Sequence, residues 1–360
     1  INATGNLSIR GYAQLDFNQK FESDIRHNGN LDVHRLVLFI GYKFSDKTSF
    51  ISELEVEHAS EFFIEQAFVQ HNITRGINFR AGLLLIPMGI INEYHEPTTF
   101  HGVERPNLDK NLVPTTWREL GAGFQGNIQD ANLKYQAYIV NGFKSFDEKG
   151  LLRGLDGMRK GRQKGIESIV SHPNFAAKAS YYGIKNLNLG LSTYTGKTSS
   201  TLYDGMATGS DSLEKMADSS VVGLSMIGLD ARYERKGLQV RGQYIFSSIS
   251  NTDEYNVFTG SDLGSEMSGF YIEAAYDILQ HINRNSESEL FPFVRYENYN
   301  THAATESINE NDAYNRTEIT AGLTYKINKG VALKADLQFL DNDAISKAVK
   351  QLNLGVGIWF

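Results

Sequence analysis

The 360-residue sequence contains no cysteine and only six prolines. The absence of cysteine excludes disulfides, thiolate metal sites and a catalytic thiol. Positive charge is not in excess either, because 35 Lys and Arg residues stand against 42 Asp and Glu residues, for a formal charge of -7. Nucleic acid is therefore not an expected partner. The longest apolar stretch, residues 82–91, is shorter than the roughly 18 residues that a membrane-spanning helix requires.

What the sequence does contain is strict alternation of apolar and other residues, clearest in the segment 352–360. Leu352, Leu354, Val356, Ile358 and Phe360 share one face of an extended chain. Because lipid offers no hydrogen-bond partners, a β-structure crosses a bilayer only as a closed cylinder with apolar residues outside. A strand of this pattern that ends on an aromatic residue is typical of an outer-membrane β-barrel.

Strand-like segments with this period-two pattern recur along the whole chain. They occupy residues 6–17, 33–44, 49–58, 62–72, 77–86, 118–128, 132–141, 174–184, 187–196, 221–235, 238–249, 268–279, 289–299, 316–327, 331–341 and 350–360. The pattern predicts an all-β fold, a transmembrane antiparallel β-barrel of about 16 strands. We interpret residues 1–360 as a single barrel domain.

The predicted connections alternate between tight turns and long polar loops, with one exception at residues 59–61, where a short link replaces a long loop. This asymmetry is typical of the periplasmic and external ends of a barrel in the bacterial outer membrane. About sixteen strands enclose an aqueous lumen. A soluble β-sandwich or solenoid is the disfavoured alternative, because so many charged rows would leave too little dry core.

If the apolar rows face lipid, the opposite rows face the lumen. On this assignment Arg10, Arg35 and Arg80 come from the first, second and fifth strands, close together on one wall, where they would form a basic stripe that guides anions. The alternative is cross-strand ion pairing with carboxylates such as Glu53 and Glu55. Both interpretations place these residues on the pore wall.

The loop of residues 87–117 contains four of the six prolines and is partly apolar. A long loop that is stiff and apolar is suited to folding into the lumen and narrowing it. As the third long loop, it would then line the constriction with Glu93, His95, Glu96 and Arg105. A lid packed on the external loops is the alternative.

Two further patterns point to less specific chemistry. Glu93, His95, Glu96 and His101 invite a metal-site interpretation, but HEPTT lacks the second histidine of the zincin pattern HExxH, so we expect no metal and no cofactor. The basic run MRKGRQKG, residues 158–165, is either a site that gathers anions or a solvated loop, and we favour the loop.

No nucleophile elbow of the GxSxG type is present, so a barrel hydrolase has little support.

Three segments carry a family resemblance: RLVLFIGYKFSDKTSFISELEVEH (residues 35–58), EQAFV (65–69) and RAGLLLIPMGIINEYHEPTTFHGVERP (80–106). Together they resemble the phosphate-selective porin O and P family in its Bacteroidota form. The resemblance implies a sixteen-stranded, trimeric porin whose third long loop enters the channel. It also implies that arginines select phosphate at the constriction, for which Arg10, Arg35, Arg80 and Arg105 are the candidates.

These observations favour an outer-membrane porin for passive diffusion of small hydrophilic solutes, with a mild preference for anions such as phosphate. We expect it to be a homotrimer in contact with outer-membrane lipid and lipopolysaccharide, and not an enzyme. The alternative is a closed or plugged barrel that serves as an accessory subunit of a larger outer-membrane complex.

Overall fold

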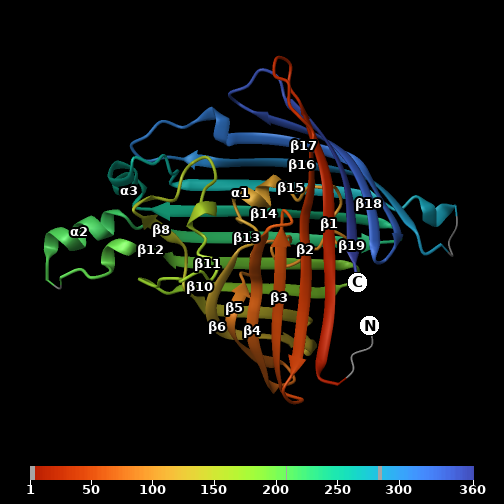
Figure 1. The fold of residues 1–360 in the computed structure, drawn as a ribbon, viewed down its shortest axis with the longest axis horizontal. Coiled ribbons are helices and arrows are strands. Elements are labelled where there is room, and N and C mark those ends of the chain that lie inside the picture. Colours follow the sequence, from red (N-terminus) through yellow and green to blue (C-terminus); the bar gives the residue numbers. More distant parts are fainter. Residues whose placement is uncertain (1–4, 208, 283–285) are drawn as a thin grey trace.

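The computed structural model describes residues 5–207, 209–282 and 286–360, and within them sixteen antiparallel strands close into a barrel (Figure 1). Each barrel strand pairs with the next one along the chain, and β19 pairs with β1, so the sheet has no free edge. The barrel strands are β1 (Leu7–Phe21), β2 (Asn30–Lys43), β3 (Thr48–Glu57), β4 (Glu61–Thr74), β5 (Ile77–Leu85), β6 (Arg118–Ile128), β7 (Leu133–Val140), β10 (Asn174–Ile184), β11 (Leu187–Lys197), β13 (Gly223–Arg235), β14 (Leu238–Ser250), β15 (Glu266–Tyr276), β16 (Glu289–Ala304), β17 (Asn315–Asn328), β18 (Val331–Asn342) and β19 (Val349–Trp359). The predicted fold class is confirmed.

The remaining elements lie in the connections. They are the short strands β8 (Lys144–Asp147), β9 (Lys149–Gly150) and β12 (Ser199–Ser200), the helices α1 (Asn107–Asn111), α2 (Asp211–Ser219) and α3 (Thr252–Thr259), and the single 3-10 turns η1 (Gln129–Ala131), η2 (Arg159–Gly161), η3 (Thr201–Tyr203), η4 (Leu279–His281) and η5 (Asp312–Tyr314). None of the helices in the described ranges is long and apolar enough to cross a membrane.

The burial pattern along the strands is the reverse of that in a soluble protein, because apolar side chains are exposed and polar side chains are buried. On β2, Leu36 and Leu38 are 42% and 38% exposed, whereas Arg35 and Val37, which alternate with them, are buried. The polar row of β18 is buried in the same way, as Lys334 shows at 6% exposure. Because successive side chains of a strand point to opposite faces, the apolar row covers the outside of the barrel and the polar row faces its interior.

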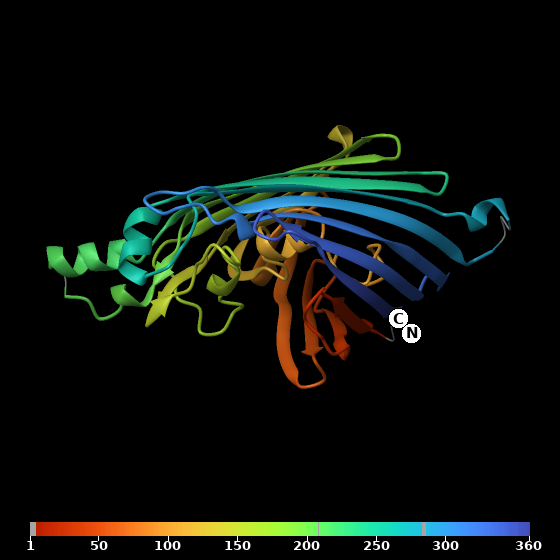
Figure 2. The ribbon, with the colours of Figure 1, turned by 90° about the horizontal axis from the view of Figure 1, so that it is seen from above.

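The two ends of the barrel differ in their connections. Long segments such as 86–117, 141–173 and 198–222 join strands at one end, which we call the long-loop end; α2 and α3 lie there (Figures 1 and 2). Turns as short as 185–186 and 236–237 join strands at the opposite, short-turn end. The exception predicted near residue 60 is present, because residues 58–60 link β3 to β4 at the long-loop end.

Candidate functional site: the barrel interior

The segment between β5 and β6, residues 86–117, folds back on itself inside the barrel; we call it the plug loop. Its two ends are joined directly, because Ile86 N donates to the Trp117 carbonyl at 3.0 Å. Asn92 holds both ends as well: its side chain donates to the carbonyls of Ile86 at 2.7 Å and Trp117 at 2.9 Å, and accepts from Trp117 N at 2.7 Å. The loop therefore leaves and re-enters the wall at one point.

Hydrogen bonds connect the plug loop to several sides of the wall. Ile90 N donates to Gln243 on β14 at 2.8 Å, and Leu108 N donates to Glu297 on β16 at 3.0 Å. Lys178 on β10 donates to the Gly89 carbonyl at 2.6 Å. Because these strands lie on different sides of the closed sheet, the plug loop crosses the lumen.

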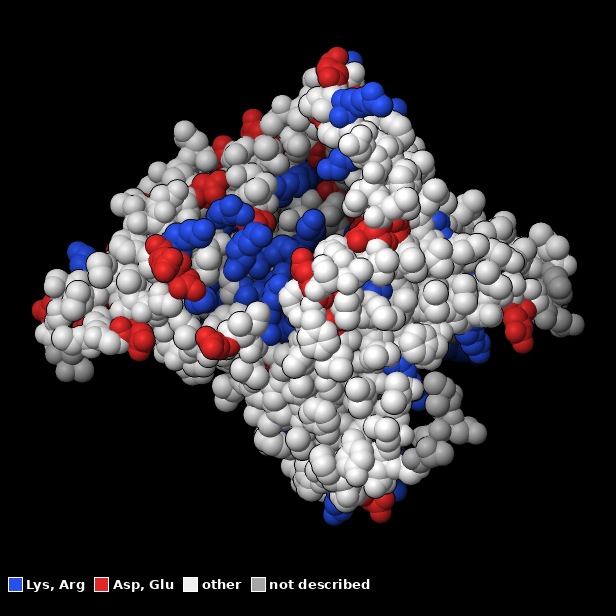
Figure 3. Space-filling model, viewed as in Figure 1, with Lys and Arg blue, Asp and Glu red and all other residues white. Residues whose placement is uncertain are grey.

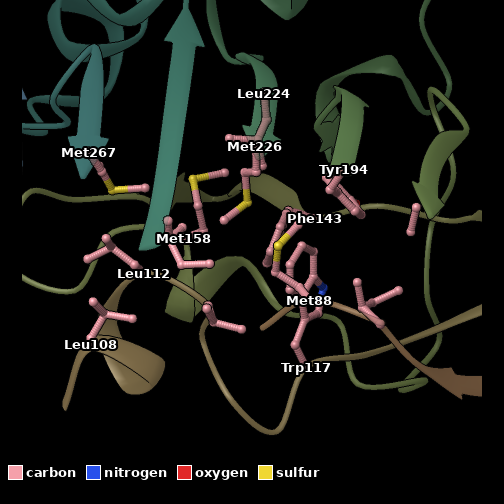
Figure 4. Close-up of a cluster of buried hydrophobic side chains, with 14 of the residues drawn as sticks. Met88, Leu108, Leu112, Trp117, Phe143, Met158, Tyr194, Leu224, Met226 and Met267 are labelled. Carbon is pink, nitrogen blue, oxygen red and sulfur yellow. The ribbon is translucent and has the colours of Figure 1, made fainter. Parts of the chain in front are cut away.

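An apolar cluster fills part of this interior (Figure 4). Trp117 of the plug loop packs against Tyr194 of β11, with ring centroids 4.6 Å apart, and against Phe143, at 4.7 Å. Met88 and Met226 belong to the same buried cluster. Packed side chains therefore occupy a share of the lumen, because the plug loop brings in an apolar surface of its own.

At the long-loop end the plug loop leaves a cavity of about 360 Å³ that is rich in positive charge; we call it the basic cavity. Figure 3 shows Lys and Arg side chains gathered in a hollow of the face that it draws. Among the described residues, seven cationic side chains line the cavity: Arg35, Arg105, Lys110, Arg118, Arg159, Arg162 and Lys164. Three carboxylates accompany them: Glu55, Glu57 and Glu104.

These positive charges are only partly neutralised. Arg35 pairs with Glu55 at 3.1 Å and with Glu57 at 3.6 Å. Within the part of the chain that the structure describes, the other six cations of the basic cavity form no ion pair with a carboxylate. The basic cavity therefore carries a net positive charge that a solute anion would neutralise.

The basic run 158–165 contributes to this cavity, so the interpretation of the run as a solvated loop is wrong. Arg159 donates to the Thr115 carbonyl at 2.6 Å, and Arg162 donates to the carbonyls of Pro114 at 3.0 Å and Thr115 at 2.8 Å. The acceptors are backbone carbonyls of the plug loop, so these hydrogen bonds attach the run to the plug loop. Backbone acceptors contributed by a distant loop leave no pattern in the sequence.

The structure brings five of the predicted site residues together on one side of the lumen. Arg35 pairs with Glu55, as the cross-strand alternative proposed, and Glu53 lies next to it on the inward row of β3. His95 of the plug loop approaches Glu53 at 3.9 Å, and Arg105 donates to the His95 carbonyl at 2.9 Å. These residues connect the plug loop to β2 and β3.

The other four predicted site residues lie elsewhere. Glu93 pairs with Lys178 at 2.7 Å, and it lines with Arg80 a separate cavity of about 400 Å³ toward the short-turn end. Glu96 is half-buried in the plug loop, and Arg10 is exposed on β1 near the short-turn end. Arg10, Arg35 and Arg80 therefore do not form one basic stripe, because Arg35 lies toward the long-loop end, whereas Arg10 and Arg80 lie toward the short-turn end.

Sequence reasoning missed Glu65, Arg118 and the basic cavity itself. In the ladder, Glu53 pairs with Gln66 and Leu54 pairs with Ile64, so Glu65 is an extra residue in a β-bulge. A bulge interrupts the alternation of the two faces and redirects a side chain. Simple period-two counting along β4 therefore fails at the point where a buried carboxylate enters the lumen.

A closed sixteen-stranded barrel with an apolar outer face, a polar interior and a loop across the lumen has the architecture of a porin-type barrel of the bacterial outer membrane. Solved structures with the same fold include OmpF of Salmonella typhi in complex with daunomycin (TM-score 0.65, 12% identity, covering 100% of this chain and 99% of that one). An anion-selective porin from Comamonas acidovorans has a TM-score of 0.61 and 14% identity, over 98% and 99% of the two chains. A trimer form of OmpT from Vibrio cholerae has a TM-score of 0.53 and 11% identity, over 99% and 100%.

One sequence relative is similar enough to define a family. An uncharacterized protein of Aquifex aeolicus is 32% identical over 348 residues, which cover 92% of this chain and 74% of the relative. The chain belongs to the same family as that protein. No protein-family model matches the sequence, so membership of the phosphate-selective porin O and P family stays an interpretation of its motifs.

Proposed function

We propose that this protein is an outer-membrane porin through which small hydrophilic solutes diffuse passively, with a preference for anions. The observation that carries the proposal is the basic cavity, where seven cationic and three acidic side chains of the described residues surround about 360 Å³. Cations that lack carboxylate partners raise the local concentration of anions in a confined space. Phosphate is one candidate among the small anions. The proposal includes no catalytic step.

In this account the plug loop sets the size limit of the channel and the wall charges set its ion preference. The constriction that we propose includes Arg35, Glu53, Glu55, His95 and Arg105. The positive side of the basic cavity comes from Arg118 and the run 158–165, so an anion meets the cations before it reaches the narrow part. We also propose assembly as a homotrimer, which the trimer form of the Vibrio cholerae barrel supports by analogy of fold alone.

A closed barrel is a second candidate, and one observation favours it. The basic cavity at the long-loop end shares no lining residue with the two cavities nearer the short-turn end, of about 400 and 580 Å³. The plug loop separates them. If this separation persists in the membrane, the barrel conducts no ions and serves as an accessory subunit.

The reversal potential of purified protein in a planar bilayer tests the anion preference. Under a tenfold KCl gradient, we expect a potential of the sign that anion selectivity gives, and a larger one in dilute than in concentrated salt, because mobile ions screen the wall charges. Replacing chloride with phosphate in the same gradient shows whether phosphate is carried. A potential of the opposite sign would contradict the proposed preference.

Lys164 gives the proposed channel a pH dependence. Burial, together with the nearby charges of Arg162 and Arg118, lowers the pKa of Lys164 to about 8. Because Lys164 is protonated below this pH and neutral above it, raising the pH from 7 to 9 removes one positive charge from the basic cavity. A unit charge about 8 Å from an ion in water is worth about 0.5 kcal/mol, with opposite sign for an anion and a cation, so the anion-to-cation permeability ratio should fall about fivefold. The reversal potential of Lys164→Gln should lack this step, and an equal step in that variant would contradict the assignment.

A further inference from the structure

Three side chains that ligate metals converge inside the barrel from three different elements. Nε2 of His95 in the plug loop lies 3.3 Å from Oε2 of Glu65 on β4 and 3.9 Å from Oε1 of Glu53 on β3. The side chains of all three are at most 6% exposed. Their ligand atoms lie within 4.8 Å of one another. The convergence therefore depends on the plug loop being in place.

The β-bulge in β4 is what adds Glu65 to this group. Because Glu53 pairs with Gln66 and Leu54 with Ile64, Glu65 has no partner in the ladder, and its side chain is buried while that of Ile64 is exposed. Bulges of this kind redirect a side chain and occur next to functional sites. Here the bulge places a second carboxylate opposite His95.

The atoms that face one another are not satisfied by hydrogen bonds. Among the described residues, neither oxygen of Glu65 nor Nε2 of His95 has a hydrogen-bond partner, although both side chains are buried. Three cations lie nearby, and each is engaged elsewhere: Arg35 by Glu55 and Glu57, Arg105 by the His95 carbonyl, and Arg118 by Thr116. A buried carboxylate without hydrogen bonds is costly, so Glu65 requires a positive charge on the side of His95, which either a proton on Nε2 or a bound cation supplies.

The surroundings fix the orientation of the ligand atoms. Nδ1 of His95 lies 3.3 Å from the Asn92 carbonyl, so Nδ1 carries a proton and Nε2 is the nitrogen that faces the carboxylates. The Gln66 side chain donates to Oε2 of Glu53 at 2.7 Å and leaves Oε1 directed toward His95. Outer contacts of this type hold histidine and carboxylate ligands in metal sites.

We propose that Glu53, Glu65 and His95 bind one divalent transition-metal ion, of which Zn²⁺ is the representative. Zn–N and Zn–O bonds of about 2.0–2.2 Å place neighbouring ligand atoms roughly 3.0–3.5 Å apart. The distance of 3.3 Å from His95 to Glu65 lies in this range, and that of 3.9 Å from His95 to Glu53 lies slightly beyond it. Two carboxylates balance the charge of the ion, and the imidazole favours Zn²⁺ over Mg²⁺ or Ca²⁺. The metal ties the plug loop to β3 and β4. This site does not depend on whether the barrel conducts.

Metal titration of the purified, folded barrel tests the proposal. After treatment with a chelator, the wild-type protein should bind one equivalent of Co²⁺, seen in its visible absorption, and release it when Zn²⁺ is added. The variants His95→Gln and Glu65→Gln should bind at least about 100-fold more weakly. His101→Gln is the matched control, because His101 is the other histidine of the plug loop and contacts Gln239 at 2.9 Å, outside the site. Its affinity should equal that of the wild type.

Three results would overturn the site: no stoichiometric binding of Co²⁺ or Zn²⁺ by the wild type, wild-type affinity in His95→Gln, or tighter binding of Mg²⁺ than of Zn²⁺. Circular dichroism without metal shows whether each variant is folded. If Glu65→Gln does not fold, Glu53→Gln gives the same readout, because it removes a ligand from a different strand.

Discussion

Removal of the plug loop should raise the single-channel conductance several-fold. In this deletion variant, a Gly-Ser-Gly linker replaces residues 88–116. The barrel should still close, because Ile86 N bonds the Trp117 carbonyl and Leu85 pairs with Arg118 at the base of the loop. With the loop absent, a sixteen-stranded barrel encloses a wide aqueous lumen. Conductance steps in planar bilayers, recorded for both proteins in the same salt, measure the effect.

A shortened external loop provides the control for this deletion. Replacement of α2 (Asp211–Ser219) by a similar linker removes a mostly exposed helix at the long-loop end and leaves the plug loop intact. Its conductance should match that of the wild type. An unchanged conductance in the plug-loop deletion, with a folded barrel by circular dichroism, would show that residues 88–116 do not limit the flow of ions.

Loss of three cations from the basic cavity should weaken the anion preference at least about tenfold at low salt. The triple variant Arg159→Gln, Arg162→Gln and Lys164→Gln removes three charges that have no carboxylate partner in the described residues. At about 8 Å in water, each charge is worth about 0.5 kcal/mol, and the sum of about 1.5 kcal/mol corresponds to roughly a factor of ten for the anion alone. The opposite effect on the cation adds to the change in the ratio. The effect should shrink in 1 M salt, where the screening length is about 3 Å.

The matched control removes the same charge from the surface of the same end. Lys149, Lys160 and Lys197 are exposed and do not line the basic cavity. Their triple replacement by Gln should leave the reversal potential unchanged. Equal shifts in the two triple variants would mean that the net charge of the long-loop end, and not the basic cavity, sets the ion preference.

The barrel strands could be predicted because a membrane-spanning strand repeats one local rule, apolar outside and polar inside. The predicted ranges 118–128 and 174–184 coincide with β6 and β10. The prediction ended too early for β16, which extends to Ala304, because its last residues continue the pairing with β15 beyond the alternating segment. Strand boundaries depend on neighbours that a single segment does not show.

The interior was harder to predict because it is made of contacts between distant segments. Alternation along β3 assigned Glu53 and Glu55 to the lumen, where the structure places them. The same counting missed Glu65, because the β-bulge shifts the phase of β4. Arg159 and Arg162 depend on carbonyls of the plug loop, which any residue type would supply. Residue identity therefore carried no signal for these contacts.

The single-channel conductance of the unmodified protein tests the central claim most directly. We expect purified, folded barrels in a planar bilayer to give discrete, ohmic conductance steps that are smaller than those of the plug-loop deletion. A wild-type protein that inserts and stays silent, while the plug-loop deletion conducts, would contradict the claim of a porin and support the closed barrel.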